Sequence, residues 1–195
     1  MEICMNKKYS IIILPLLLSS CGVPIVGGIG SVGMHAVEDR GIGGTFSDEA
    51  LQFTIRSKLC GEVPNCHVID MTVYKSRVLM TGVVESQKVK AEAVRVAKSV
   101  DGVKEVIDGL NVEGQDTFSE YIRDGRITTK LKTALYAEED VYAPNYTITT
   151  FDKVVYIFGI AESQEEMKLV IDNAYNITGV KKVVNLIEIK KSAPK

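Results

Sequence analysis

Residues 78–112 read VLMTGVVESQKVKAEAVRVAKSVDGVKEVIDGLNV, and residues 155–189 repeat that pattern as VYIFGIAESQEEMKLVIDNAYNITGVKKVVNLIEI. Ten of the 35 aligned positions are identical without a gap, at an offset of 77 residues. Upstream, Ile55 aligns with Ile127 at an offset of 72, so the second copy has five extra residues after its first helix. The chain therefore contains two homologous units.

Hydrophobic periodicity predicts the element order αββαβ in each unit. Ser47 is the expected N-cap of the first helix, which carries the apolar stripe Leu51, Ile55 and Leu59. The other expected elements of the first unit are strands 68–74 and 78–84, a helix opened by Ser86, and strand 103–112. Those of the second unit are helix 127–136, strands 147–151 and 154–160, helix 163–177 and strand 180–190.

These elements predict an α+β fold of two tandem αββαβ units, each a small three-stranded mixed sheet packed by two helices. We place the units at residues 47–112 and 119–191. Four glycines recur at strand and helix ends, where a turn or a close backbone approach requires them: Gly82, Gly102, Gly159 and Gly179.

Residues 1–20 are expected to be a signal peptide, whether the chain starts at Met1 or Met5. Two lysines precede the apolar run 11–18, which is too short to span a membrane. The run ends Leu18-Ser-Ser-Cys21, which resembles a bacterial lipoprotein signal, and that resemblance implies lipidation of Cys21. The alternative is an ordinary cleaved signal with an incidental Cys21. Because Gly22 follows the cysteine, the resemblance implies the outer membrane.

Residues 21–46 hold eight of the sixteen glycines and are expected to form a tether. Two cysteines remain, Cys60 and Cys66, and an oxidising periplasm permits a disulfide between them. Free thiols, or a metal site with the neighbouring His67, are the alternatives. Three ligands within eight residues and no fourth make a poor metal site, so we expect no metal and no cofactor.

Composition argues against two function classes. The net charge is −2, with 23 basic and 25 acidic residues, so no global basic field for nucleic acid exists. Only two histidines are present, and no serine has the sequence context of a nucleophile. Glu85 and Glu162 sit in different copies at helix starts, where a helix-terminal charge is the simpler role. We expect a binding protein and not an enzyme.

The motif Leu79-x-x-Gly82-Val83 before a helix and Gly102-Val-x-x-Val106 after it, both present again in the second unit, resemble a BON domain. With the lipoprotein signal, the chain is similar to the dual BON-domain outer-membrane lipoproteins. That resemblance implies binding of anionic phospholipid, support of outer-membrane integrity, and a lipid surface on the first helix of the second unit. The residues there are Arg123, Arg126, Lys130, Thr133 and Tyr136.

Two alternatives stay open. The cationic segment is either this lipid surface or an ordinary solvated helix face, and Glu138, Glu139 and Asp140 directly after it would be repelled by anionic headgroups. Phe53 lies opposite the apolar stripe of the first helix, so we expect it to be exposed and to contact a partner. The second functional hypothesis is accordingly a scaffold that docks an envelope assembly or secretion complex.

Overall fold

The structure is a computed structural model that describes residues 41–112 and 118–191, and both units have the predicted αββαβ order. The first unit contains helix α2 (Gly41–Glu62), strands β1 (Asp70–Tyr74) and β2 (Arg77–Val84), helix α3 (Gln87–Lys98) and strand β3 (Glu105–Val112). The second contains α4 (Phe118–Ala137), β4 (Tyr146–Phe151), β5 (Val154–Ala161), α5 (Gln164–Asn176) and β6 (Lys182–Ile189). The predicted α+β fold is confirmed.

Each unit has a three-stranded mixed sheet with the same topology. The strand orders are β1-β2-β3 and β4-β5-β6. In both sheets the first pair is an antiparallel hairpin and the second pair is parallel, connected through α3 or α5. The parallel crossover needs a helix of this kind, because a tight turn cannot join parallel strands.

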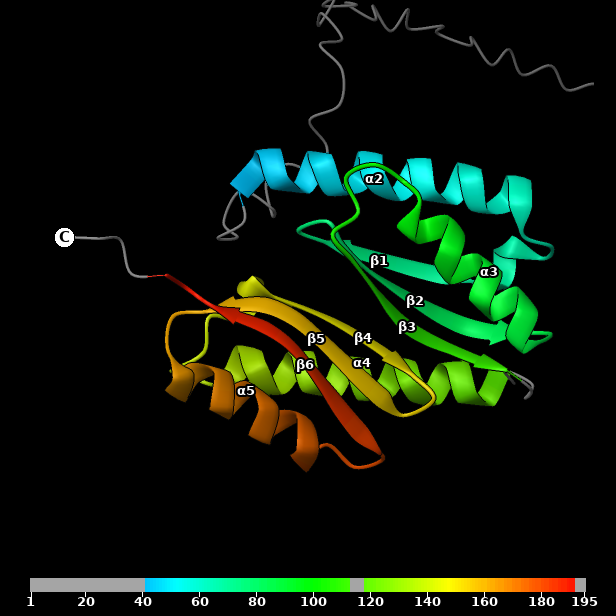
Figure 1. Ribbon diagram of the computed structural model, residues 1–195. Helices are drawn as coiled ribbons and strands as arrows, with labels where there is room; N and C mark the ends of the chain where they lie inside the picture. The colour runs from blue at the N-terminus through cyan, green and yellow to red at the C-terminus, as the bar shows by residue number, and fades with distance from the viewer. Residues whose placement is uncertain (1–40, 113–117, 192–195) are drawn as a thin grey trace, which may run out of the picture.

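The two sheets pack face to face, and the helices form the two outer layers (Figure 1). Each unit has its own core between its helices and its sheet. A third apolar cluster lies between the sheets and joins the units. Its buried members are Tyr74, Leu79, Tyr156 and Phe158. The rings of Tyr74 and Phe158 stack with their centroids 5.6 Å apart. The alternating residues of one sheet therefore serve two cores, one on each face.

The first helix of each unit begins earlier than predicted. Helix α2 starts at Gly41, so the N-cap at Ser47 is wrong and the helix includes the last residues of the expected tether 21–46. Helix α4 starts at Phe118 and not at Ile127. Extending a formed helix adds one backbone hydrogen bond per residue, which offsets a glycine cost of about 1 kcal/mol each.

Strand β1 begins two residues later than predicted, at Asp70, because Cys66–Val68 forms a 3₁₀ helix. This 3₁₀ helix follows Asn65, which has a left-handed backbone with φ of 52°. The amide of Val68 donates to the carbonyl of Asn65 at 3.1 Å, so Val68 does not join the ladder. A second 3₁₀ helix, Ala143–Asn145, leads into β4 in the same way.

A buried carboxylate on the first helix of each unit holds the hairpin turn. Asp48 is 4% exposed and accepts the amides of Lys75 and Ser76 at 2.7 and 2.8 Å. Asp124 is 7% exposed and accepts the amide of Lys153 at 3.1 Å. Both turns have two consecutive residues with positive φ, as a two-residue hairpin requires. This bond ties each first helix to its hairpin.

The four recurrent glycines meet two different requirements. Gly102 and Gly179 follow α3 and α5 with φ of 94° and 100°, the left-handed conformation that ends a helix. At Gly82 an added Cβ would lie 2.1 Å from the carbonyl oxygen of Val68, and at Gly159 it would lie 2.7 Å from that of Asn145. These two glycines therefore allow each 3₁₀ helix to approach the middle strand.

Candidate functional site

Helix α4 forms part of the outer layer of the second unit, and its apolar stripe determines which residues face outward. Ile127, Leu131 and Leu135 are at most 2% exposed and pack in the core of that unit. Successive helical residues are rotated by about 100°, so the intervening positions point away from this core. Four of the five residues proposed from the sequence are exposed there: Arg126, Lys130, Thr133 and Tyr136.

The cations of α4 do not all have the same environment. Arg126 and Lys130 are exposed one turn apart, and neither forms an ion pair with any residue in the described ranges. Arg123 is half-buried, and its guanidinium lies 3.8 Å from the carboxylate of Glu120. The structure therefore brings two of the three proposed cations together as unpaired charges and gives the third a carboxylate neighbour.

Two aromatic rings flank these cations along the helix. Tyr136 is 65% exposed near the C-terminal end of α4, and Tyr121 is 76% exposed near its start. The hydroxyl of Thr133 donates to the carbonyl of Thr129 at 3.0 Å, so its hydrogen bond stays within the helix. At about 100° per residue, Tyr121 lies about 140° from Arg126 and about 180° from Lys130 around the helix, so it is not on the face of the cations. The exposed cations themselves suit a surface that carries negative charge.

A groove of about 870 Å³ lies between the two units beside this face. One wall comes from the edge strand β1 and residues next to it, including Val68 and Met71. The other comes from α4 and β4, and Arg126 and Lys130 belong to its lining. We call this space the inter-unit groove.

Polar side chains in the inter-unit groove are largely bonded to one another. The hydroxyls of Thr72 and Thr149 lie 3.1 Å apart across the two units. Thr128 donates to the hydroxyl of Thr150 at 2.7 Å. At the edge of β1, the carbonyl of Met71 accepts from Gln52 at 3.1 Å, and that of Ile69 accepts from Arg56 at 2.6 Å. The groove therefore offers mostly satisfied polar atoms and apolar surface.

A family comparison explains the duplication. The BON-domain model matches residues 47–114 and residues 123–191, which together are more than half of the chain. The chain belongs to the BON-domain family. Each αββαβ unit is thus one BON domain, and α4 is the first helix of the second BON domain.

Three relatives are similar over most of their length. The outer membrane lipoprotein DolP of Haemophilus influenzae is 27% identical over 185 residues, 93% of this chain and 95% of that protein. The osmotically-inducible protein Y of Escherichia coli is 31% identical over 76% of each chain. An uncharacterised Anaplasma centrale protein is 36% identical over 64% of this chain and 83% of its own. The similarity to DolP supports an envelope-associated dual BON-domain protein.

Sequence reasoning missed two features of this second BON domain. Tyr121 and Gly125 lie before the predicted helix start at Ile127, and the lipid surface proposed from the sequence does not include them. Once the helix extends to Phe118, Tyr121, Gly125 and Thr129 fall at i, i+4 and i+8. That spacing is the signal that could have found them. All three line the inter-unit groove.

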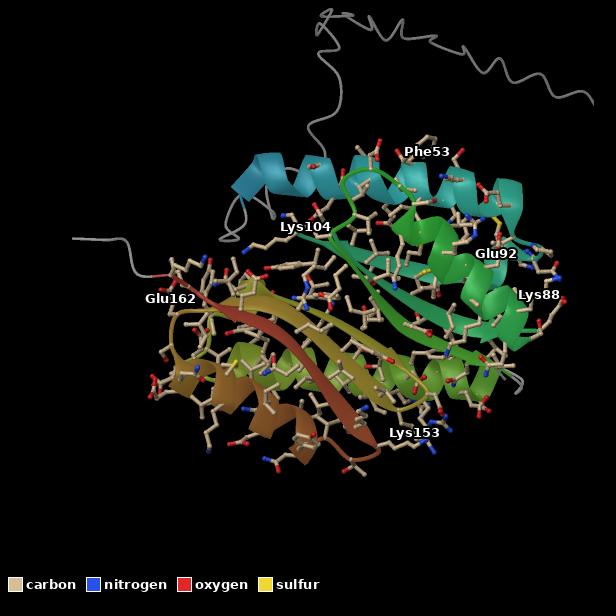
Figure 2. All side chains as sticks on the ribbon, in the orientation of Figure 1. Phe53, Lys88, Glu92, Lys104, Lys153 and Glu162 are labelled. Atoms are coloured by element: carbon tan, nitrogen blue, oxygen red, sulfur yellow. A yellow bond between two sulfur atoms is a disulfide. The ribbon has the colours of Figure 1, made fainter. Side chains whose placement is uncertain are left out.

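Phe53 lies far from the α4 face. It is 76% exposed on α2 in the first BON domain and points away from the sheets (Figure 2). Helices α2 and α4 belong to opposite outer layers (Figure 1). Phe53 is exposed as expected, and it forms a surface separate from the cations of α4.

The cysteines have structural placements where they are described. Cys60, near the end of α2, forms a disulfide with Cys66, the first residue of the 3₁₀ helix whose Val68 lines the groove. Cys21 lies outside the described residues. Within residues 41–112 and 118–191 no group of three or more His, Cys, Asp and Glu side chains could hold a metal ion. No helix in this part of the chain has the length and hydrophobicity needed to cross a membrane.

Two buried tyrosines have altered acidity. Burial raises the pKa of Tyr156 between the sheets, and the nearby carboxylates of Asp108 and Asp152 raise it further. Burial also raises the pKa of Tyr146, with an added contribution from Glu166. Both phenols are therefore neutral at physiological pH, and both belong to the packed interior rather than to the α4 face.

Proposed function

We propose that this BON-domain protein is a lipid-anchored periplasmic binding protein of the outer membrane, which recognises anionic phospholipid through α4 and supports envelope integrity without turnover. The supporting observation is the pair of exposed cations Arg126 and Lys130, one turn apart and without carboxylate partners in the described residues. Each cation near an anionic leaflet contributes about 1 kcal/mol.

Negative charges that follow α4 favour one orientation of the helix. Glu139 and Asp140 are exposed beyond its C-terminal end, where an anionic leaflet would repel them. The contact is therefore made mainly by the part of α4 that carries Arg126 and Lys130.

Vesicle co-sedimentation of the full chain tests this function, with Cys21→Ser as background so that no anchor contributes. We expect binding to vesicles that contain phosphatidylglycerol and much weaker binding to neutral phosphatidylcholine vesicles. The double variant Arg126→Glu/Lys130→Glu removes two cations, which predicts a loss of affinity of roughly 30-fold or more. Binding should also fall as salt rises, because exposed charges are screened.

The matched control is the double variant Lys88→Glu/Lys98→Glu, which reverses the charge of two exposed lysines on α3 in the first BON domain. It changes the net charge by the same amount, and Figure 2 shows Lys88 on that helix. Equal loss in both double variants, or equal binding to neutral and anionic vesicles, would contradict recognition by α4.

The anchor is a separate part of the proposal. A lipidated Cys21 would hold the protein permanently at the membrane, because several acyl chains bind far more stably than one. Mass spectrometry of the protein isolated from its native membrane should find an acylated residue at Cys21, in the outer-membrane fraction. An unmodified thiol there would remove the anchor from the proposal.

The second candidate function is a protein-interaction scaffold, and the exposed ring of Phe53 favours it. A side chain of that size at 76% exposure is common at contact surfaces. A photo-crosslinker placed at Phe53 in intact cells should capture one envelope protein in stoichiometric yield under this hypothesis. Scattered labelling at Phe53, together with intact anionic-vesicle binding by Phe53→Asp, would contradict the scaffold hypothesis and leave lipid binding as the remaining function.

A further inference from the structure

The inter-unit groove has a lining that fits a hydrocarbon chain. Apolar residues of both BON domains line it, among them Val68, Ile122 and Phe151. Its volume of about 870 Å³ lies in the range of roughly 300–1,000 Å³ that is typical of sites for small ligands. Exposed apolar surface of this kind is costly in water unless something covers it.

The hydrogen bonds around the groove argue against an extended peptide. A peptide that adds a strand needs free backbone groups along a sheet edge. At β1 the carbonyls of Ile69 and Met71 already accept from Arg56 and Gln52. The threonine hydroxyls are paired with each other, so they present mainly their methyl groups. An occupant without hydrogen-bonding groups matches this lining best.

The charges place an anion at one side of the groove. Arg126 and Lys130 line its α4 wall as exposed cations. The carboxylate on that wall, Asp124, is buried and accepts the amide of Lys153. The exposed carboxylate of Asp70 lies on the β1 wall. A phosphate is therefore attracted to the α4 side and repelled from the β1 side. The same wall thus combines a site for a negative headgroup with access to an apolar space.

We propose that the inter-unit groove takes one acyl chain of a glycerophospholipid while the phosphate of that lipid lies against Arg126 and Lys130. The inference rests on the proposed function and deepens it: the protein binds a single lipid molecule drawn from the leaflet, and does not only adsorb to its surface. Both BON domains contribute to the site, because β1 belongs to the first and α4 to the second.

Gly125 provides the test. It lines the groove on α4, and an added Cβ there meets no atom within 4 Å. The backbone at Gly125 therefore accepts a Cβ, so Gly125→Leu adds an apolar side chain at the groove wall and replaces a poor helix former. The matched control is Gly61→Leu, since Gly61 also lies in a helix with open space around it and does not line the groove.

The experiment uses the full chain with Cys21→Ser and short-chain phosphatidylglycerol held below its micelle concentration. We expect this lipid to bind about tenfold more tightly than its deacylated headgroup, because methylene groups become buried. Gly125→Leu should weaken lipid binding by a similar factor, and Gly61→Leu should not change it. Thr129→Leu, one turn along the same wall, is a second variant with the same expectation.

The effect of Gly125→Leu on vesicle affinity has opposite signs for surface adsorption of α4 and for entry of an acyl chain into the groove. If α4 only adsorbs to the leaflet, an added exposed leucine at position 125 strengthens binding. If an acyl chain enters the groove, the same leucine weakens it. Stronger vesicle binding by Gly125→Leu, or equal affinity for lipid and headgroup, would overturn the groove proposal while leaving recognition of anionic lipid intact.

Two other outcomes are also decisive. A synthetic peptide of residues 22–33, which is rich in glycine and apolar residues, is added as a competitor. If this peptide binds the groove more tightly than the lipid, the groove holds a segment of the chain and the proposal is wrong.

If wild-type protein binds neither vesicles nor soluble lipid, the proposed function itself fails.

Discussion

Arg77 of the first BON domain donates a hydrogen bond to the carbonyl of Leu186 in the second at 2.9 Å. The same guanidinium lies 5.4 Å from the ring centroid of Phe158, and its side chain is only 17% exposed. Lys75 adds an ion pair to Glu188 at 3.0 Å between the same two domains. These contacts surround the apolar cluster between the sheets, so we expect the two BON domains to unfold together.

Arg77→Ala should therefore destabilise the whole chain. Hydrogen bonds from charged groups contribute about 1.5–3 kcal/mol, so we expect a loss in that range. Chemical denaturation followed by circular dichroism measures it. Arg95→Ala is the control, because Arg95 is 56% exposed and pairs with surface carboxylates, so its loss should lower stability much less. Equal losses in the two variants would contradict a specific tie between the domains.

Asp48→Ala should destabilise the first BON domain, because two turn amides lose their acceptor. Buried groups that are left unsatisfied cost about 1–3 kcal/mol. Hydrogen exchange should show faster exchange of the amides of Lys75 and Ser76, which bond to this carboxylate. Asp101→Ala, at an exposed position after α3, should change neither quantity. Unchanged protection of the two turn amides in Asp48→Ala would refute the role assigned to this carboxylate.

Gly82→Ala and Gly61→Ala should have effects of opposite sign. At Gly82 a Cβ would lie 2.1 Å from the carbonyl oxygen of Val68, and φ is 132°, so we expect a severe loss of stability. At Gly61 nothing lies within 4 Å, and alanine should stabilise the helix by up to about 1 kcal/mol. Thermal denaturation compares the two, and a neutral Gly82→Ala would show that the 3₁₀ helix need not approach β2.

Stability should fall at high pH because of the buried tyrosines. Their pKa values are raised in the folded state, so the unfolded chain loses these protons first, near a pH of about 10. Stability is therefore fully present below that pH and is lost as the pH rises toward the folded pKa. Tyr156→Phe should flatten the decline of melting temperature above a pH of about 9.5.

Tyr175→Phe is the comparison variant, since it makes the same substitution at a tyrosine that is 58% exposed. Absorbance of tyrosinate in the folded protein follows the same groups directly. A profile that is identical in wild type and Tyr156→Phe would show that Tyr156 does not contribute to the alkaline loss.

Local patterns were sufficient to predict the elements of each unit, because strand alternation and helix periodicity are properties of short segments. The apolar stripe Ile127, Leu131 and Leu135 and the cap Ser86 are where the sequence places them. Helix starts were less predictable. Nothing in the glycine-rich stretch at 41–46 signals a helix, and its inclusion in α2 follows from propagation of a helix nucleated further along the chain.

The candidate site was only partly predictable for a different reason. Exposure of Arg126 and Lys130 follows from their helical phase, but the inter-unit groove depends on contacts between residues far apart in sequence. Thr72 meets Thr149 across 77 positions, and no local pattern encodes that contact. The packing of one sheet on the other therefore had to be observed before the groove could be recognised.

In the proposed function, α4 faces anionic lipid. Paramagnetic broadening of backbone amide signals, in the full chain with Cys21→Ser bound to phosphatidylglycerol bilayers with spin-labelled headgroups, tests it most directly. We expect the strongest broadening around Arg126 and Lys130 on α4 and little on α2 around Phe53. Strongest broadening around Phe53, or broadening spread evenly over both outer layers, would contradict it.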